Sequence, residues 1–230
     1  LVRRGAGPEG FVALALPRSV ELIVAMWAVA KSGAAFVALD PGNPAYRLAE
    51  LLADSHCTLG ITVEEVTKNL PDCVDWLVLD AAERADDEGA EADWSTTTVE
   101  ADSSAYLIFT SGSTGRPKAV HIDHRGGLRD RVTELGDYFG VQAGSAVLQV
   151  SSPGFDACVS EVLLAHGNGA CLVVAPPQDV YGGTDLEELV RAEEISCAII
   201  TPTALNTMDP ARCRRSRRSR WSGRRPARTS

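Results

Sequence analysis

Short apolar runs alternate with amphipathic stretches along most of the 230 residues. Each apolar run is bounded by Gly, Pro or polar residues and is shorter than a typical helix, so we expect buried β-strands. The predicted strands cover residues 11–16, 34–40, 58–63, 75–80, 105–110, 119–123, 145–151, 170–175 and 196–201.

Helical patterns separate most of these strands. Ser19 is the expected N-cap of a helix over 20–32 that ends at Gly33, and Pro44 is expected to open a second helix. Further helices are predicted over 125–139, 156–166 and 185–194. This alternation favours an α/β fold of stacked βαβ units with mostly parallel sheets, in which ligands bind at the carboxyl ends of the strands.

Two stretches depart from this pattern. Residues 81–101 are polar, acidic and aperiodic, which is typical of a surface excursion. After Asp209 the chain loses its periodicity and almost all its apolar residues, so it cannot extend the core. We therefore expect one partial domain over 1–211 and a basic, disordered tail over 212–230.

The charge distribution disfavours a nucleic-acid role for the body of the chain. The net charge is −9, but nine Arg and no acidic residues lie from Arg212 onward. The remaining 13 basic and 31 acidic residues give residues 1–211 a net charge of −18. No apolar run approaches the roughly 20 residues of a membrane span, and LVRRGAGPEG lacks the features of a signal peptide. We expect a cytoplasmic chain that is entered partway.

Neither the cysteines nor the histidines suggest a metal centre. The six cysteines show no CxxC spacing, and their positions favour reduced, buried thiols. The four histidines form no ligand-spaced group beyond His121 and His124, which we expect to flank a turn. No metal-ligating residue is therefore predicted.

The segment TSGSTGRPK, residues 110–118, has the composition of an anion-binding loop. Gly112 and Gly115 allow positive φ or close approach to a ligand, and consecutive backbone N–H groups can form an anion-binding nest. Lys118 supplies a flexible cation, and Arg116 is a second candidate. Hydroxyl donors are available from Thr110, Ser111, Ser113 and Thr114. The loop favours polyphosphate binding, with an ordinary Gly/Ser-rich turn as the alternative.

This loop differs from a Walker A loop. Its glycines are three residues apart, Pro117 precedes Lys118, and a strand pattern rather than a helix follows. A hairpin-like flap is therefore expected to carry the phosphates.

The full string AYLIFTSGSTGRPKAV resembles the signature of the adenylate-forming superfamily, and it is most similar to the adenylation domains of nonribosomal peptide synthetases. Three further stretches resemble motifs of that branch in the same order. They are AVAKSGAAFVALDPGNPAYRLAELLADS, GFDACVSEVLLAHGNGACLVV and ISCAIITPTALNTMDP. The resemblance covers roughly residues 11–211 and implies part of the large N-terminal domain of the adenylate-forming fold.

The resemblance implies a two-step ligase. The carboxylate of an amino acid would attack the α-phosphate of ATP, with Mg²⁺ sharing the charge on the phosphates, to give an aminoacyl-adenylate and pyrophosphate. The phosphopantetheine thiol of a peptidyl carrier protein, within neighbouring synthetase modules, would then accept the aminoacyl group. Positioning and charge stabilisation would supply most of the catalysis.

The resemblance also assigns site residues. Residues 110–118 would bind the β- and γ-phosphates, with Thr110 and Lys118 in catalytic roles. Asp156 would bind the substrate α-amino group, with a helix N-cap as the alternative. Ala157, Ser160 and Ile199 would line the substrate pocket, with plain packing as their alternative, and together they favour a small-to-medium, uncharged side chain.

The chain departs from the family pattern in two ways. Ala119 stands where a glycine usually follows the lysine, and the adenine-binding motif, the ribose-binding aspartate, the hinge and the small C-terminal domain do not follow. We therefore expect the chain alone to be inactive. An acyl- or aryl-acid CoA ligase and an inactive remnant or binding module are the alternative functions.

The basic tail has two interpretations. An Arg/Ser/Gly/Pro run is typical of GC-rich DNA translated in a shifted frame, which suggests a frameshift near Ala211. A genuine basic tail that binds nucleic acid or an acidic surface is the other interpretation.

Overall fold

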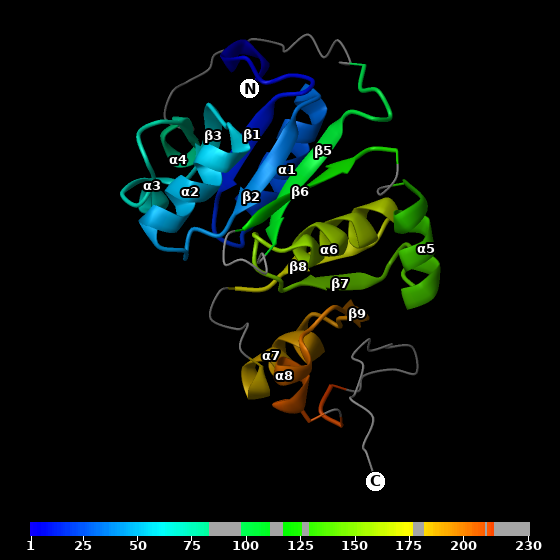
Figure 1. The fold of residues 1–230 in the computed structure, drawn as a ribbon. Helices are drawn as coiled ribbons and strands as arrows, with labels where there is room; N and C mark the ends of the chain where they lie inside the picture. The colour runs from blue at the N-terminus through cyan, green and yellow to red at the C-terminus, as the bar shows by residue number, and fades with distance from the viewer. Residues whose placement is uncertain (83–97, 111–116, 126–128, 177–181, 210, 214–230) are drawn as a thin grey trace. The chain divides into compact units, whose positions relative to one another are not determined.

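The computed structural model describes residues 1–82, 98–110, 117–125, 129–176, 182–209 and 211–213 (Figure 1). The chain divides into two compact units. Unit 1 comprises Leu1–Leu128 and Pro153–Phe155, and unit 2 comprises Arg129–Ser152 and Asp156–Ser230. Each unit has its own sheet and its own apolar core.

Unit 1 is built around a sheet to which the described residues contribute six strands, in the order β4-β3-β1-β2-β5-β6. Neighbouring strands run parallel except β5 and β6, which form an antiparallel pair. The strands are β1 (Phe11–Ala15), β2 (Ala35–Leu39), β3 (Leu59–Thr62), β4 (Asp75–Val78), β5 (Ser104–Thr110) and β6 (Lys118–Asp123). The helices are η1 (Val2–Arg4, a 3-10 helix), α1 (Val20–Ser32), α2 (Ala45–Ser55), α3 (Glu64–Thr67) and α4 (Leu79–Ala82).

Helices cover both faces of this sheet because successive connections run in opposite directions. The chain passes from β1 to its neighbour β2 through α1, and from β2 back past β1 to β3 through α2. Right-handed crossovers therefore place α1 and α2 on opposite faces. All five residues of β2 are buried, as expected for a strand covered on both sides.

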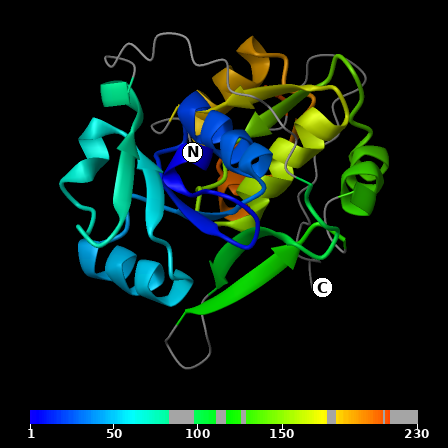
Figure 2. The same ribbon diagram turned by 90° about the horizontal axis from the view of Figure 1, so that it is seen from above.

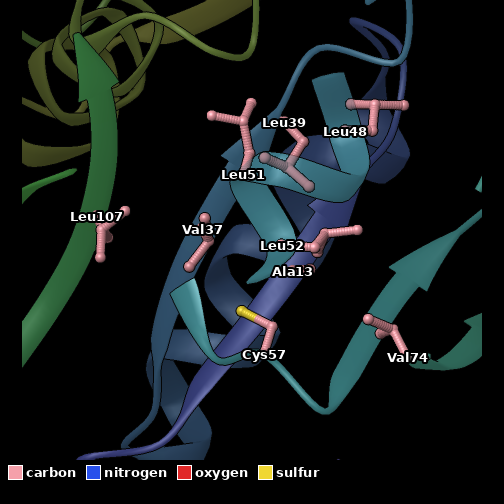
Figure 3. Close-up of a cluster of buried hydrophobic side chains, with 9 residues drawn as sticks. All are labelled: Ala13, Val37, Leu39, Leu48, Leu51, Leu52, Cys57, Val74 and Leu107. Atoms are coloured by element: carbon pink, nitrogen blue, oxygen red, sulfur yellow. The ribbon is translucent and has the colours of Figure 1, made fainter. Parts of the chain in front are cut away.

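The core beneath α2 explains how this helix is held. Leu48, Leu51 and Leu52 lie at helical spacing and pack with side chains of β1, β2 and β5. Figure 3 shows the whole cluster, which consists of Ala13, Val37, Leu39, Leu48, Leu51, Leu52, Cys57, Val74 and Leu107.

Local signals fix the ends of α1 and α2. The Ser19 side chain accepts a hydrogen bond from the Leu22 N–H at 3.3 Å, and Gly33 ends α1 with a φ of 81°. Pro44 directly precedes α2, and His56, which follows the last residue of this helix, adopts the left-handed conformation. The predicted boundaries of α1 are thereby confirmed.

Unit 2 contains a parallel sheet, to which the described residues contribute three strands in the order β8-β7-β9. The strands are β7 (Ala146–Gln149), β8 (Cys171–Val174) and β9 (Cys197–Ala198). The helices are α5 (Arg129–Phe139), α6 (Asp156–Gly167), α7 (Gly183–Ala192) and α8 (Pro202–Asn206). The central strand β7 packs Val147 with Leu164 of α6 and Leu148 with Leu186 of α7, so both of its faces are covered.

The predicted α/β class with mostly parallel sheets is confirmed, but several element boundaries differ from the prediction. The helix predicted over 185–194 is α7, which spans Gly183–Ala192. The strand predicted over 75–80 ends at Val78, because α4 begins at Leu79. The strand predicted over 145–151 is limited to β7, and that predicted over 196–201 is limited to β9. The short helices α3, α4 and α8 were not predicted.

Sequence chemistry accounts for α8. Thr201 caps the helix by accepting a hydrogen bond from the Ala204 N–H at 3.2 Å, and Pro202 occupies its first turn. Pro at this position is favoured because the first helical N–H has no partner within the helix. The Thr201–Pro202 pair could therefore have predicted the start of α8, but the apolar run before it was interpreted as a strand that extends to Thr201.

The thiols only partly follow the expectation. All six cysteines are free, and four are buried, but Cys73 and Cys171 are exposed. Cys171 begins β8, whose one partner strand among the described residues is β7, so Cys171 lies at an edge of the described sheet.

Near the predicted domain boundary, Arg212 and Cys213 are among the described residues. Cys213 is buried in the core of unit 2 beside Met208, and Arg212 Nη1 lies 3.7 Å from Glu187 Oε2. The greater part of the predicted surface excursion and of the basic tail lies outside the described residues, so the boundary at 211 stays a prediction.

Truncating the buried Leu52 should destabilise the protein more than truncating an exposed residue of the same helix. Leu52 is 2% exposed, so Leu52→Ala is expected to lower the free energy of unfolding by about 2–5 kcal/mol through lost burial and a residual cavity. Tyr46 lies on the same helix and is 71% exposed, so Tyr46→Ala is the matched control. Urea unfolding followed by circular dichroism measures both; equal effects would contradict the assigned core.

Candidate functional site

The predicted phosphate loop lies between the two strands of a β-hairpin. Thr110, the last residue of β5, is paired with Lys118, the first residue of β6, and the Thr110 hydroxyl donates to the Lys118 carbonyl oxygen at 3.4 Å. Figure 1 and Figure 2 show the two strands side by side in green. The predicted hairpin is confirmed, and it brings Thr110 and Lys118 together with both residues exposed.

The remaining residues predicted for this loop lie outside the described residues. They are Ser111, Gly112, Ser113, Thr114 and Gly115, with Arg116. Their role in phosphate binding stays a prediction.

Contacts at the base of the hairpin hold it against the sheet. His121 Nε2 and Ser104 Oγ are hydrogen-bonded across the two strands, and the Phe11 ring meets the His121 ring edge-on. On β5, Tyr106 stacks on Phe36 of β2 with ring centroids 5.5 Å apart. The end of the hairpin that lies away from the loop is thus anchored to the parallel strands.

Three of the predicted substrate residues lie on the first two turns of α6. Asp156 is the first residue of the helix and is exposed, whereas Ala157 and Ser160 are half-buried. Within the described part of the chain, the Asp156 carboxylate makes no hydrogen bond or ion pair. Asp156 and Ser160 are four residues apart and share one face of the helix. Ile199 is half-buried and directly follows β9, in the same unit.

A buried carboxylate next to these residues was missed by the sequence predictions. Glu161 is fully buried and joins α6 to the end of β7. It accepts hydrogen bonds from the Val150 N–H at 3.2 Å, the Ser151 N–H at 3.2 Å, the Ser151 hydroxyl at 2.8 Å and the Gln149 side-chain amide at 3.3 Å. The sequence feature that could have indicated a buried carboxylate is the position of this acidic residue on the apolar face of the stretch ACVSEVLLA.

Burial dominates the electrostatics of Glu161. Desolvation raises the pKa of its carboxyl group to about 7, and the hydrogen bonds from Ser151, Val150 and Gln149 offset part of that rise. Burial, with the Glu161 charge as a smaller cause, also raises the pKa of the Cys197 thiol to about 11. Cys197 therefore stays protonated, and Glu161 changes its charge near neutral pH.

The chain matches the sequence model of the AMP-binding enzyme family over residues 1–226. It belongs to that family. Novobiocin biosynthesis protein H of Streptomyces niveus is 41% identical over 218 residues, covering 91% of this chain and 36% of the relative. A dimodular nonribosomal peptide synthase of Bacillus subtilis is 36% identical over 225 residues, covering 93% of this chain and 9% of the relative.

Solved structures give the same assignment. The nonribosomal peptide synthetase FmoA3, bound to α-methyl-L-serine-AMP, has a TM-score of 0.78 at 27% identity, covering 93% of this chain and 24% of that one. The N-terminal subdomain of Klebsiella oxytoca NpsA, in complex with 3-hydroxybenzoyl-AMSN, has a TM-score of 0.71 at 28% identity, covering 87% and 49%. The resemblance to nonribosomal peptide synthetase adenylation domains is confirmed, and the chain matches an N-terminal part of the adenylate-forming fold.

The length of the matches sets the extent of this assignment. The chain spans about a third of the S. niveus relative and less than a tenth of the B. subtilis one.

Among the described helices, none combines the length and apolar character that a bilayer crossing requires.

Glu161 should make the stability of the chain depend on pH. Its pKa is raised from 4.5 in the unfolded chain to about 7, so the folded state binds the proton more tightly. The resulting stabilisation is fully present below pH 4.5 and is lost as the pH rises through 7, a change of roughly 3 kcal/mol. Urea unfolding at several pH values measures the free energy of unfolding of the wild type and of Glu161→Gln. The difference between the two should fall as the pH rises; a difference that does not change with pH would contradict the prediction.

Proposed function

We propose that this chain supplies the phosphate-binding loop and the first part of the substrate pocket of an amino-acid adenylation domain in a nonribosomal peptide synthetase. In the proposed reaction, the carboxylate oxygen of an amino acid attacks the α-phosphorus of ATP. The bond to the bridging oxygen of pyrophosphate breaks, and the aminoacyl-adenylate remains. The phosphopantetheine thiol of a carrier protein then takes the aminoacyl group and releases AMP.

The observation that carries the choice of an amino acid is the environment of Asp156. Its carboxylate is exposed, has no partner among the described residues and lies beside two half-buried small residues, so it is accessible to the ammonium group of a substrate. A substrate without an amino group has no use for that charge. Ala157 and Ser160 are both small and uncharged, which favours a small-to-medium, uncharged substrate side chain.

The hairpin residues have a complementary role in this proposal. Lys118 and the Thr110 hydroxyl border the loop, where they can approach the β- and γ-phosphates and stabilise the charge that passes to pyrophosphate. Mg²⁺ shares this charge when it is bound. No cluster of three or more His, Cys, Asp or Glu side chains suited to an ion occurs among the described residues.

A second candidate is an aryl-acid ligase. The NpsA subdomain, which covers 87% of this chain, is bound to a 3-hydroxybenzoyl analogue. The two candidates differ in whether Asp156 affects substrate affinity. An inactive remnant is the third possibility, and it predicts that neither kind of acid binds.

Replacing Lys118 should weaken polyphosphate binding. In the 230-residue chain, we expect Lys118→Ala to reduce affinity for magnesium tripolyphosphate by about tenfold, because one charge-assisted contact is lost. Lys68 is an exposed lysine of the same unit, so Lys68→Ala is the control. Isothermal titration measures both variants; an unchanged affinity in Lys118→Ala would remove Lys118 from the site.

Replacing Asp156 should remove amino-acid binding. Saturation-transfer NMR on the 230-residue chain, with a mixture of proteinogenic amino acids, should detect binding that Asp156→Asn weakens by about tenfold or more. Asp185 is an acidic residue in the first turn of α7, so Asp185→Asn is the matched control. Equal binding of 3-hydroxybenzoate by the wild type and Asp156→Asn, without amino-acid binding, would favour the aryl-acid candidate.

A further inference from the structure

Glu161 connects two elements at a single point. It lies five residues after Asp156 on α6, and its carboxylate reaches the carboxyl end of β7 in the same unit. Both of its oxygens accept hydrogen bonds from Ser151, and one of them also accepts from Val150 and Gln149. The Gln149 side-chain amide in turn donates to the Ser151 carbonyl oxygen at 2.9 Å, which closes the network on the same turn.

These hydrogen bonds provide acceptors for two backbone N–H groups that lie beyond the paired residues of β7. β7 ends at Gln149, so the N–H groups of Val150 and Ser151 lie past its last paired residue. Buried N–H groups need an acceptor, and here the acceptor comes from α6. An apolar side chain at position 161 would avoid the desolvation of a carboxylate but would leave both N–H groups without this partner.

The same bonds fix the helix relative to the strand. An α-helix is rigid over a few residues and rises 1.5 Å per residue, so Asp156 lies about 7.5 Å along the axis from Glu161. Anchoring Glu161 to the end of β7 therefore fixes the rise and the rotation of the first two turns of α6. Ala157 lies four residues before Glu161, and Ser160 is its direct neighbour, so both positions depend on this anchor.

We propose that Glu161 is a positioning residue for substrate binding, which holds the start of α6 against β7 so that Asp156, Ala157 and Ser160 keep a fixed spacing from the sheet. This inference rests on the proposed function for its substrate readout. Glu161 itself is buried and contacts no substrate; it acts through the helix.

A second buried carboxylate in unit 2 provides the matched control. Glu187 of α7 is 6% exposed, accepts a hydrogen bond from the Asp209 N–H and lies 3.7 Å from Arg212 Nη1. It holds the segment after α8 rather than α6. Removing it should destabilise unit 2 without loosening the β7–α6 connection.

The experiment compares Glu161→Ala, Glu161→Gln and Glu187→Ala in the 230-residue chain. Hydrogen exchange measured by mass spectrometry should rise in peptides covering residues 150–160 in Glu161→Ala and stay unchanged there in Glu187→Ala. By NMR titration with the amino acid that gives the largest saturation transfer to the wild type, affinity should fall at least tenfold in Glu161→Ala. Glu161→Gln keeps an oxygen acceptor for the backbone N–H groups, so its affinity should stay within about threefold.

Affinity for magnesium tripolyphosphate separates positioning from general loss of structure. We expect it to stay within twofold of the wild type in all three variants, because the hairpin belongs to unit 1. If Glu161→Ala and Glu187→Ala weaken amino-acid binding equally, or if Glu161→Ala leaves it unchanged, the inference is overturned.

A milder variant covers the case in which Glu161→Ala does not fold. Ser151→Ala removes the hydroxyl donor to Glu161 and leaves both backbone N–H groups in place, so it should weaken amino-acid binding about threefold and raise exchange over the same peptides. If the wild type binds no amino acid, the proposed function fails for this chain. The exchange pattern then decides the positioning of α6 by itself: unchanged exchange over 150–160 in both Glu161→Ala and Ser151→Ala would overturn it.

Discussion

Backbone groups at the end of a strand in a mostly parallel sheet lose their sheet partners, and three predicted site residues of this chain lie at or after such strand ends. Within such a sheet the backbone groups pair with neighbouring strands, but where a strand ends, the next N–H and C=O groups need other partners. Thr110 is the last residue of β5, Asp156 follows the turn after β7, and Ile199 follows β9. The apolar interior builds the scaffold, and the strand ends supply the polar chemistry.

The two units meet this constraint in different ways. In unit 1, β5 and β6 form an antiparallel hairpin, and Thr110 and Lys118 are the last pair of residues before its loop. In unit 2, β7 is followed by a turn and a helix, and the helix returns a carboxylate to the strand end.

Local chemistry made much of the fold predictable, and long-range pairing limited the rest. The ends of α1 could be predicted because Ser19 and Gly33 act within a few residues of the helix. The hairpin could be predicted because glycines and Pro117 separate two strand patterns. The end of β9 could not be predicted by hydrophobicity, since the apolar run continues through Ile199 and Ile200 after the strand ends at Ala198.

Glu161 shows the same limit within the candidate site. Its partners are 10 to 12 residues away, and two of its bonds come from backbone N–H groups, which every residue type except proline carries. No sequence pattern predicts a hydrogen bond between a helix carboxylate and the backbone N–H groups at a strand end. The family resemblance assigns Asp156, Ala157 and Ser160 to the substrate pocket, but it gives no role to Glu161, the residue that we propose positions them. A residue that contacts the ligand can be found by its motif, whereas a residue that acts by satisfying the backbone is found only once the strand end and the helix have been brought together.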